Sequence, residues 1–342
     1  MNNSKQTYYN PHFSHIYIEK EVINHLRTKE ILSRFPYAQT IVIDHYKDVF
    51  NRRKQDYMRQ QKAQSLILAA EHGSFFYEGA PVCQNFGNIN FYYCSTMKNC
   101  VFDCSYCYLK GMYPSGHMVI YVNIEDYFEA LEQLLQKESM YLCVSYDADL
   151  LAMESVAGYA AKWAEFAGNH ENLKLEMRTK SARLAMWDEL PCLSNVIYAF
   201  TLSPQSVIET CEHFTPSAEA RIACALEGLE RGFPVRLCFD PMLYVPTWRE
   251  DYGELLLELD AAFASHGVTM QQLTDVSVGT FRISQDYLKK LRRVEPTAPA
   301  VQFPYVNVDG VYQYPPALLA EMENYLIGEL EKRIDKEKIY HE

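Results

Sequence analysis

Apolar and polar residues follow one recurring pattern along most of this chain. Short apolar runs, which predict strands, are each followed by a longer run whose apolar residues recur every three or four positions, which predicts an amphipathic helix. The expected strands span residues 89–93, 141–145, 173–177, 196–202, 235–239 and 276–283. The expected helices span residues 124–138, 156–166, 182–190, 218–231, 252–263 and 287–292.

Six strand and helix units in succession predict an α/β fold. Such strands pair in parallel through right-handed crossovers, and six units fall short of the eight in a closed TIM barrel. The sequence therefore predicts a partial (β/α)6 barrel of the TIM type over residues 82–295. Residues 1–81 are expected to form an N-terminal α/β extension with a strand at residues 39–44, and residues 296–342 a C-terminal β-hairpin plus helix.

The composition is that of a folded protein with an acidic surface. Of the 342 residues 48% are hydrophobic, enough for a sizeable core, and the net charge is −12. This charge argues against a protein that coats nucleic acid, but it leaves room for a local basic face. The basic segment, residues 47–62, is predicted to be one helix whose charges are solvated in preference to binding phosphate. Its cations are Lys47, Arg52, Arg53, Lys54, Arg59 and Lys62.

The chain is expected in the cytoplasm. It begins with polar residues and lacks the apolar run of a secretory signal, and no stretch approaches the ~18 apolar residues that span a membrane. Most of the ten cysteines are scattered singly, which suits a reducing compartment better than a disulfide framework.

Three cysteines stand close together in the run CVFDCSYC at residues 100–107. Cys100, Cys104 and Cys107 can supply three thiolates to a 4Fe-4S cluster, and a cube with three protein ligands leaves one iron open. S-adenosylmethionine can chelate such an iron through its amino and carboxylate groups. With Tyr106 before the last cysteine, the CxxxCxφC spacing resembles the radical S-adenosylmethionine superfamily. In that superfamily one electron from the cluster cleaves the cofactor to a 5′-deoxyadenosyl radical.

A zinc knuckle is the competing interpretation of the cysteine run. Zinc needs a fourth ligand, which usually comes from a second close pair of cysteines or histidines. The sequence contains no second CxxC and no HxxxH, so the iron-sulfur interpretation is favoured.

Polar residues at the ends of the other expected strands are candidates for further contacts. In barrels of this class the chemistry lies at the carboxyl ends of the strands, where the cysteine run would also lie. Each candidate has an ordinary alternative, because a strand Cys is commonly a core residue and a Ser or Thr commonly caps a helix. The candidates are Cys143, Ser145, Lys180, Thr201, Ser203, Asp240 and Arg282.

Longer motifs resemble spore photoproduct lyase and its close relatives. The match begins with CSYCYL at residues 104–109 and YVN at residues 121–123. It continues in order with CVS at 143–145, RTK at 178–180, FTLS at 200–203, EHFTPS at 212–217 and GTFRI at 279–283. Together the matches cover roughly residues 80–330, which single motifs do not reach by chance.

The resemblance implies a reaction and roles for particular residues. In this family the deoxyadenosyl radical takes a hydrogen from a methylene-bridged thymine dimer in DNA, and the bridging carbon-carbon bond then breaks to give two thymines. Cys143 would give a hydrogen atom to the resulting thyminyl radical, and Tyr106 and Tyr108 would relay the thiyl radical. By the same match, the cluster ligands would be Cys100, Cys104 and Cys107. The residues contacting S-adenosylmethionine would be Ser145, Lys180, Thr201 and Tyr106.

The substrate side departs from the family pattern. The lyases carry an Arg-Tyr pair on a C-terminal hairpin that wedges into the duplex beside the lesion. Asp309 and Gly310 favour such a hairpin with a type I′ turn, and Tyr312 matches the tyrosine, but Val311 stands at the arginine position. One contact with DNA is therefore missing.

Three functions stay open on the sequence. The favoured one is a lyase acting on a DNA photolesion. The second is the same radical chemistry on another substrate, such as a modified nucleotide or a peptide, and the third is an iron-sulfur protein without turnover. For either enzyme an electron donor such as flavodoxin or ferredoxin is the expected partner, with DNA as a further partner of the lyase, and no membrane is expected.

Overall fold

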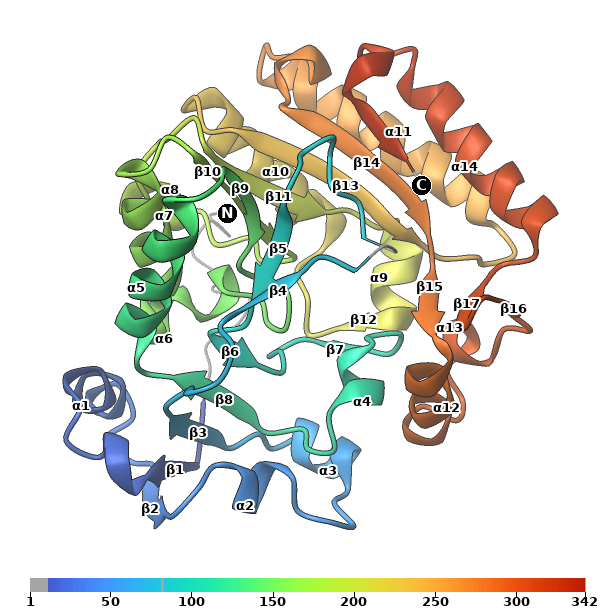
Figure 1. Ribbon diagram of the computed structural model, residues 1–342. Coiled ribbons are helices and arrows are strands. Elements are labelled where there is room, and N and C mark those ends of the chain that lie inside the picture. Colours follow the sequence, from blue (N-terminus) through green and yellow to red (C-terminus); the bar gives the residue numbers. More distant parts are fainter. Residues whose placement is uncertain (1–11, 81–82, 342) are drawn as a thin grey trace.

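The computed structural model describes residues 12–80 and 83–341 of the chain. The polar start of the chain lies outside the described residues. A large curved sheet and a smaller N-terminal sheet lie next to each other, with most helices on the outside of the larger one (Figure 1). No helix in the described ranges is long and apolar enough to cross a membrane.

The larger sheet is the predicted partial barrel. Its order is β18-β14-β13-β11-β10-β9-β5-β4. The strands from β5 to β14 pair in parallel, as predicted, while β4 adds antiparallel at one edge and β18 parallel at the other. The bounds are β4 Phe76–Glu78, β5 Phe91–Cys94, β9 Met140–Cys143, β10 Leu173–Thr179, β11 Val196–Thr201, β13 Val235–Met242, β14 Asp275–Thr280 and β18 Ile339–His341.

Helices connect these strands and bury their apolar faces against the sheet. They are α5 Ile124–Leu135, α6 Glu154–Ala157, α7 Tyr159–Gly168, α8 Met186–Glu189, α9 Gln205–Cys211, α10 Ala218–Glu230, α11 Trp248–Ser265, α12 Gln285–Val294, α13 Pro299–Gln302 and α14 Pro316–Leu330. Short 3-10 turns lie at Lys20–Val22, Leu151–Met153, Met270–Gln272 and Lys336–Lys338.

Two predicted helices are wrong in extent. The helix expected at residues 156–166 is divided into α6 and α7 by Gly158, which takes a left-handed φ of 67°. The helix expected at residues 182–190 is reduced to α8. The chain before it is held out of a helix because Asp149 accepts the Lys180 N–H at 2.8 Å and Thr179 accepts the Ser181 N–H at 2.8 Å.

The N-terminal sheet has the order β2-β1-β3-β8-β6. Its strands are β1 His15–Glu19, β2 Gln39–Ile43, β3 Leu66–Ala69, β6 Met97–Lys98 and β8 Met118–Tyr121, and α1 Leu26–Ser33 lies beside it (Figure 1). β6 and β8 flank the cysteine run and were not predicted as strands. β6 and β8 lie beyond residue 81 in the sequence but belong to the sheet of the N-terminal extension. One hydrophobic core also runs through the extension and the barrel. The division at residues 81 and 295 stays a prediction.

The basic segment is not the single helix that was predicted. It forms α2 Lys47–Phe50 and α3 Tyr57–Gln61, with Lys54 at a left-handed φ of 60° between them. The Gln55 side chain donates to the carbonyl of Phe50 at 2.8 Å. Asp56 then caps α3 by accepting the Arg59 N–H at 3.0 Å. Side-chain capping therefore breaks the helix in two.

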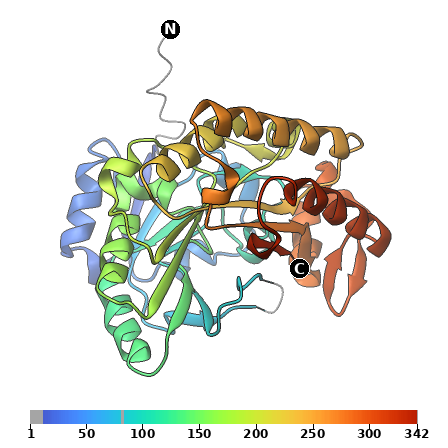
Figure 2. The same ribbon diagram turned by 90° about the horizontal axis from the view of Figure 1, so that it is seen from above.

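The C-terminal hairpin is confirmed. β16 Val306–Val308 and β17 Val311–Gln313 pair antiparallel, and β17 also pairs with β15 Arg282–Ser284. Asp309 and Gly310 have φ values of 49° and 86°, as a type I′ turn requires. Figure 2 shows the hairpin at the edge of the molecule, among the C-terminal elements.

We expect the close approach of α4, Leu109–Met112, to α12 to be sensitive to a single methyl group. A Cβ at Gly111 would stand 2.4 Å from the Tyr287 carbonyl oxygen. Gly111→Ala should therefore lower the free energy of unfolding by about 1–3 kcal/mol, measured by urea denaturation. Gly328→Ala in α14, where a Cβ meets nothing within 4 Å, should raise it by about 0.5–1 kcal/mol. Equal changes in the two variants would contradict this packing.

Candidate functional site

The three clustered cysteines lie on a loop between the two sheets. The loop leaves β6 at the edge of the N-terminal sheet, runs through β7 Asp103–Cys104 and ends at α4. Cys104 is buried, and Cys100 and Cys107 are half-buried. β7 pairs with β12 Glu212–His213, which follows α9 of the barrel. The loop is thus attached to both parts of the fold.

Hydrogen bonds from both sides fix the backbone of this cysteine loop. From the N-terminal extension, the side-chain amides of Gln61 and Gln64 donate to the carbonyl oxygen of Cys100 at 3.3 and 2.9 Å. From the barrel, the carbonyl oxygen of Cys211 accepts the Ser105 N–H at 2.8 Å. Because buried peptide groups are paired in this way, the directions of the cysteine side chains are set by the fold.

The three thiols belong to one short loop, and cysteine thiolates are the ligands that a 4Fe-4S cluster takes from proteins. Across the described ranges, no three His, Cys, Asp or Glu side chains are grouped closely enough to hold one metal ion. Burial raises the pKa of all three thiols, that of Cys100 to about 12. Iron must therefore displace the thiol protons when it binds.

Tyr106 is buried beside these cysteines and is anchored by Glu212. The Tyr106 hydroxyl donates to the Glu212 carboxylate, which also accepts from Ser203 Oγ at 3.0 Å. Arg221 pairs with the same carboxylate at 2.6 Å, and both side chains are fully buried. Burial raises the pKa of Glu212, but the charges of Arg221 and Lys180 outweigh it and bring that pKa to about 2. Glu212 is therefore ionised in the folded protein.

Lys180 directly follows β10, and its ammonium lies near Tyr106. Its Nζ is 5.7 Å from the centroid of the Tyr106 ring. Burial lowers the pKa of Lys180, but the charges of Glu212 and Cys104 outweigh it and the pKa is raised. The structure thus brings Lys180, Tyr106 and the cysteine loop together, with Lys180 cationic.

The other two residues predicted to contact S-adenosylmethionine lie at neighbouring strand ends. Ser145 follows β9, and its Oγ accepts the N–H of Arg178 at 2.6 Å. A hydroxyl that accepts in this way can still donate its own hydrogen. Thr201 is the buried last residue of β11, and its carbonyl oxygen accepts from Arg221 at 3.1 Å. The backbone of Thr201 is therefore bound to Arg221, which in turn pairs with the Glu212 carboxylate.

Cys143 ends β9 and faces the interior of the partial barrel. Its neighbours Leu142 and Val144 belong to the main core, whereas Tyr141 belongs to a separate interior cluster, as the period-two alternation requires. The Cys143 thiol lies 3.8 Å from a carboxylate oxygen of Glu176 on β10. Burial and then the Glu176 charge raise the pKa of this thiol above its usual range, so it keeps its hydrogen at neutral pH.

Tyr108 connects the cysteine loop with the strand end that carries Cys143. Its hydroxyl donates to the carbonyl oxygen of Tyr146, three residues after Cys143, at 2.6 Å. Its ring centroid lies 5.9 Å from that of Tyr146 and 6.4 Å from that of Tyr287. Aromatic contacts therefore run from β9 past the loop to α12.

Paired charges line the barrel interior, and sequence reasoning missed most of them. Arg236 on β13 is fully buried and pairs with Glu176 and Asp275. Of the predicted strand-end residues, Arg282 Nη1 lies 3.3 Å from Asp240. A signal was present in the sequence. β10 carries charges at alternate positions of a buried strand, which places them on one face: Lys174, Glu176, Arg178 and, just after the strand, Lys180.

An arginine from outside the hairpin lies next to the hairpin tyrosine, which the sequence did not predict. Val311 and Tyr312 both lie on β17. The guanidinium of Arg292, on α12, lies 5.9 Å from the centroid of the Tyr312 ring. Arg292 is held there because it also donates to the carbonyl oxygens of Val301 and Phe303 at 3.2 and 2.9 Å.

Comparisons with known proteins lead to one family. The family model described as spore photoproduct lyase matches residues 13–280. Spore photoproduct lyase of Clostridium acetobutylicum is 26% identical over 166 residues, 47% of this chain and 49% of the relative. That of Bacillus subtilis is 22% identical over 179 residues, 50% of this chain and 52% of the relative. The chain thus spans about half the length of the curated relatives it matches.

Solved structures share the fold over nearly the whole chain. A spore photoproduct lyase variant with bound AdoMet, that is S-adenosylmethionine, and dinucleoside spore photoproduct has a TM-score of 0.81 and 18% identity, covering 97% of this chain and 99% of that chain. Spore photoproduct lyase complexed with dinucleoside spore photoproduct has a TM-score of 0.80 and 18% identity, covering 96% and 98%. These likenesses show the partial-barrel fold.

We expect acid to weaken the native state partly through Glu212. The pKa of Glu212 is about 2 in the folded protein and 4.5 ordinarily. The ionised carboxylate therefore contributes its full stabilisation above about pH 4.5, and this contribution is lost as the pH falls toward about 2. Between about pH 6 and about pH 3.5, the free energy of unfolding of Glu212→Gln should fall by about 1 kcal/mol less than that of the wild type. Urea denaturation at both pH values measures this.

The control for this pH dependence is Glu209→Gln, at an exposed position of α9, the helix that directly precedes Glu212. It should keep the wild-type pH dependence, because the substituted carboxylate is solvated. If Glu212→Gln also keeps that dependence, Glu212 is not the buried, ionised group described above.

Proposed function

The chain belongs to the spore photoproduct lyase family, and from this premise we propose that it repairs the methylene-bridged thymine dimer of DNA by radical S-adenosylmethionine chemistry. The reaction breaks the bridging carbon-carbon bond and returns two thymines. The observation that carries this proposal is the convergence of Lys180 and Tyr106 on a loop of three cysteines. A protonated thiol, Cys143, lies at the end of the neighbouring strand.

Residues of this chain are suited to hold both cofactors. Cys100, Cys104 and Cys107 would bind three irons of a 4Fe-4S cluster and leave the fourth to S-adenosylmethionine. When bound, this pair supplies the carbon radical that takes a hydrogen atom from the lesion. Lys180 would pair with the carboxylate of S-adenosylmethionine, and Ser145 would donate its hydroxyl hydrogen to it. The assignments of Thr201 and Tyr106 to the cofactor rest on the family match.

Cys143 would return a hydrogen atom to the thymine radical. In this step the S–H bond breaks, a C–H bond forms on thymine, and the unpaired electron moves to sulfur. The step needs an intact S–H bond, which the raised pKa of the Cys143 thiol preserves. Tyr108 and Tyr106 would then restore the thiol by passing a hydrogen atom back to sulfur, with 5′-deoxyadenosine as the final hydrogen source, so that no tyrosyl radical remains. The contact of Tyr108 with Tyr146 supports this route, because it lies next to β9.

The hairpin and α12 would meet the DNA. Tyr312 can stack on a base beside a flipped lesion, and the Arg292 guanidinium beside it supplies the cation that Val311 does not. Exposed cations of α12 are placed to contact phosphates: Lys289, Lys290 and Arg293. The position of Arg292 favours DNA over a peptide substrate.

Turnover would require a one-electron donor. A reduced flavodoxin or ferredoxin has the chemistry to supply single electrons to an iron-sulfur cluster. A cytoplasmic location fits this proposal, because thiolate ligands persist in a reducing compartment.

We expect anaerobically reconstituted enzyme, given S-adenosylmethionine and dithionite, to convert dinucleoside spore photoproduct to thymine nucleosides, measured by mass spectrometry. Cys143→Ala should still form 5′-deoxyadenosine but should give adducts of the thymine radical in place of most of the repaired product, because the hydrogen donor is missing. Cys192→Ala, at an exposed cysteine, should repair as the wild type does.

Each outcome of this assay has a distinct meaning. Normal repair by Cys143→Ala would assign the hydrogen donor to another residue. Formation of 5′-deoxyadenosine without any change in the lesion would favour another substrate, such as a modified nucleotide or a peptide. Failure to cleave S-adenosylmethionine at all would favour an iron-sulfur protein without turnover.

We expect the hairpin to contribute to duplex binding. Tyr312→Ala should lower the affinity for lesion-containing duplex by about five- to a hundredfold, because base stacking on an aromatic ring contributes about 1–3 kcal/mol. Fluorescence anisotropy with labelled duplex measures this. Tyr37→Ala, at a tyrosine that is 96% exposed, is the matched control. Val311→Arg should strengthen binding and steepen its salt dependence, and unchanged affinity in both hairpin variants would move the DNA contact elsewhere.

A further inference from the structure

The cations of the basic segment form an unpaired positive surface on α2, α3 and the turn between them. All are exposed, and none forms an ion pair with a carboxylate of the described residues: Lys47, Arg52, Arg53, Lys54, Arg59 and Lys62. The two acids of the segment are occupied with backbone groups. Asp48 accepts the His45 N–H at 3.2 Å, and Asp56 accepts the Arg59 N–H at 3.0 Å. The two carboxylates of the segment therefore do not neutralise its cations, whose charges are available to a partner.

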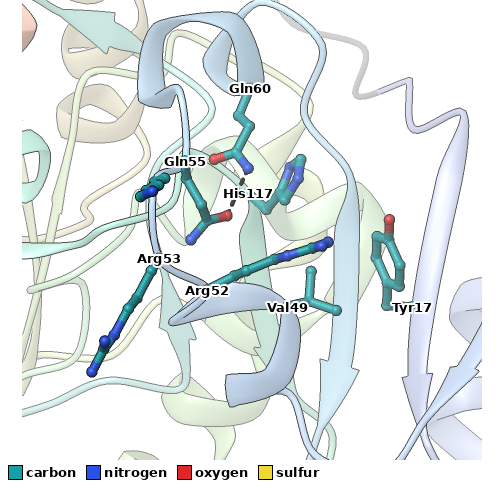
Figure 3. Close-up of a pocket in the computed structure, with 8 residues that line it drawn as sticks. Tyr17, Val49, Arg52, Arg53, Gln55, Gln60 and His117 are labelled. Carbon is teal, nitrogen blue, oxygen red and sulfur yellow. Dashed lines mark hydrogen bonds between the residues drawn. The ribbon is translucent and has the colours of Figure 1, made fainter.

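A pocket of about 530 Å³ is hollowed in this surface (Figure 3). Arg52, Arg53 and Lys54 line it together with Tyr17 and His117. The Ser65 N–H donates to Nδ1 of His117 at 3.1 Å, which leaves the ring hydrogen on Nε2, and burial lowers the pKa of this histidine to about 4. His117 is thus a neutral donor beside three cations, and the pocket suits the carboxylate of a partner.

The same segment touches the cysteine loop on its inner side. Gln60 lines the pocket, while Gln61, the next residue, donates to the carbonyl oxygens of Cys100 and Phe102 at 3.3 and 3.2 Å. Tyr57 on the same helix donates its hydroxyl hydrogen to the side chain of Asn99, the residue before Cys100, at 3.3 Å. One short helix, α3, therefore separates the positive surface from the cysteines.

We propose that this surface, centred on Arg52, Arg53 and Lys54, is the docking site of the acidic one-electron donor, a reduced flavoprotein or iron-sulfur protein. The proposal rests on the proposed function, because each reductive cleavage of S-adenosylmethionine takes one electron from the cluster, which the donor must supply by losing one electron itself. Electron transfer between proteins falls steeply with distance, so the donor must bind where the cysteines lie close to the surface. The net charge of −12 repels an acidic protein elsewhere, so the local cations orient the encounter.

Duplex DNA is the other polyanion that this surface could attract. The hairpin and α12 already offer DNA a basic surface, which includes Tyr312 and Arg292. The lesion of bound DNA must reach Cys143 at the end of β9, in the barrel interior, whereas an electron donor needs only to approach the cysteine loop from the outside, past α3. The observations therefore favour a protein donor on the α3 surface and DNA on the α12 surface.

The test uses reconstituted holoenzyme and a purified acidic flavodoxin. Arg52→Glu/Arg53→Glu should lower the affinity for oxidised flavodoxin at least about tenfold at low salt, measured by titration calorimetry. The rate of 5′-deoxyadenosine formation with reduced flavodoxin should fall in parallel, while the rate with dithionite should stay at the wild-type value. Lys29→Glu/Lys137→Glu, with the same change of charge at exposed positions, should leave the affinity and both rates unchanged.

Two outcomes would overturn the docking site. One is wild-type flavodoxin affinity in Arg52→Glu/Arg53→Glu. The other is loss of duplex DNA affinity in that variant with flavodoxin binding intact, which would assign the surface to nucleic acid. Absence of dithionite-driven cleavage in the wild type would instead count against the proposed function, so the two failures are distinguishable.

Discussion

The buried carboxylate of Glu212 is the group on which the geometry of this site depends. Its strand pairs with the strand of Cys104, and its oxygens bind Tyr106, Ser203 and Arg221. Its charge also faces Lys180, the cation nearest the cysteine loop. A carboxylate this deeply buried is tolerated only when it is fully paired, so these partners must all be in place. One charge therefore joins the loop to the ends of β10 and β11.

Paired burial of charge also explains the barrel interior. Arg236 lies between Glu176 and Asp275, and Glu176 in turn faces the Cys143 thiol. The ionised Glu176 disfavours a second negative charge beside it, which keeps the thiol protonated. The same network that makes a polar interior stable thus prepares the hydrogen donor for its proposed role.

The sequence predicted what short-range patterns determine and missed what long-range partners determine. Alternating apolar runs predicted the parallel strands, and Asp309 with Gly310 predicted the hairpin turn, because both depend on neighbouring residues. The basic segment was predicted as one helix, since its break at Lys54 comes from the side chains of Gln55 and Asp56. The role of Glu212 lay inside a recognised motif, but its partners Tyr106 and Arg221 become evident only when the chain is folded. β8 resembled a family segment, yet only the N-terminal sheet makes it a strand.

The central claim is that three fixed thiolates leave one iron of a cluster to S-adenosylmethionine. Mössbauer spectroscopy of anaerobically reconstituted protein, made with isotopically enriched iron, tests it most directly. The account predicts about four irons per chain, one of which changes its spectrum when S-adenosylmethionine is added, and loss of the whole signal in Cys104→Ala. Four irons that S-adenosylmethionine leaves unchanged, or a single zinc bound by sulfur in protein made with ample iron, would contradict it.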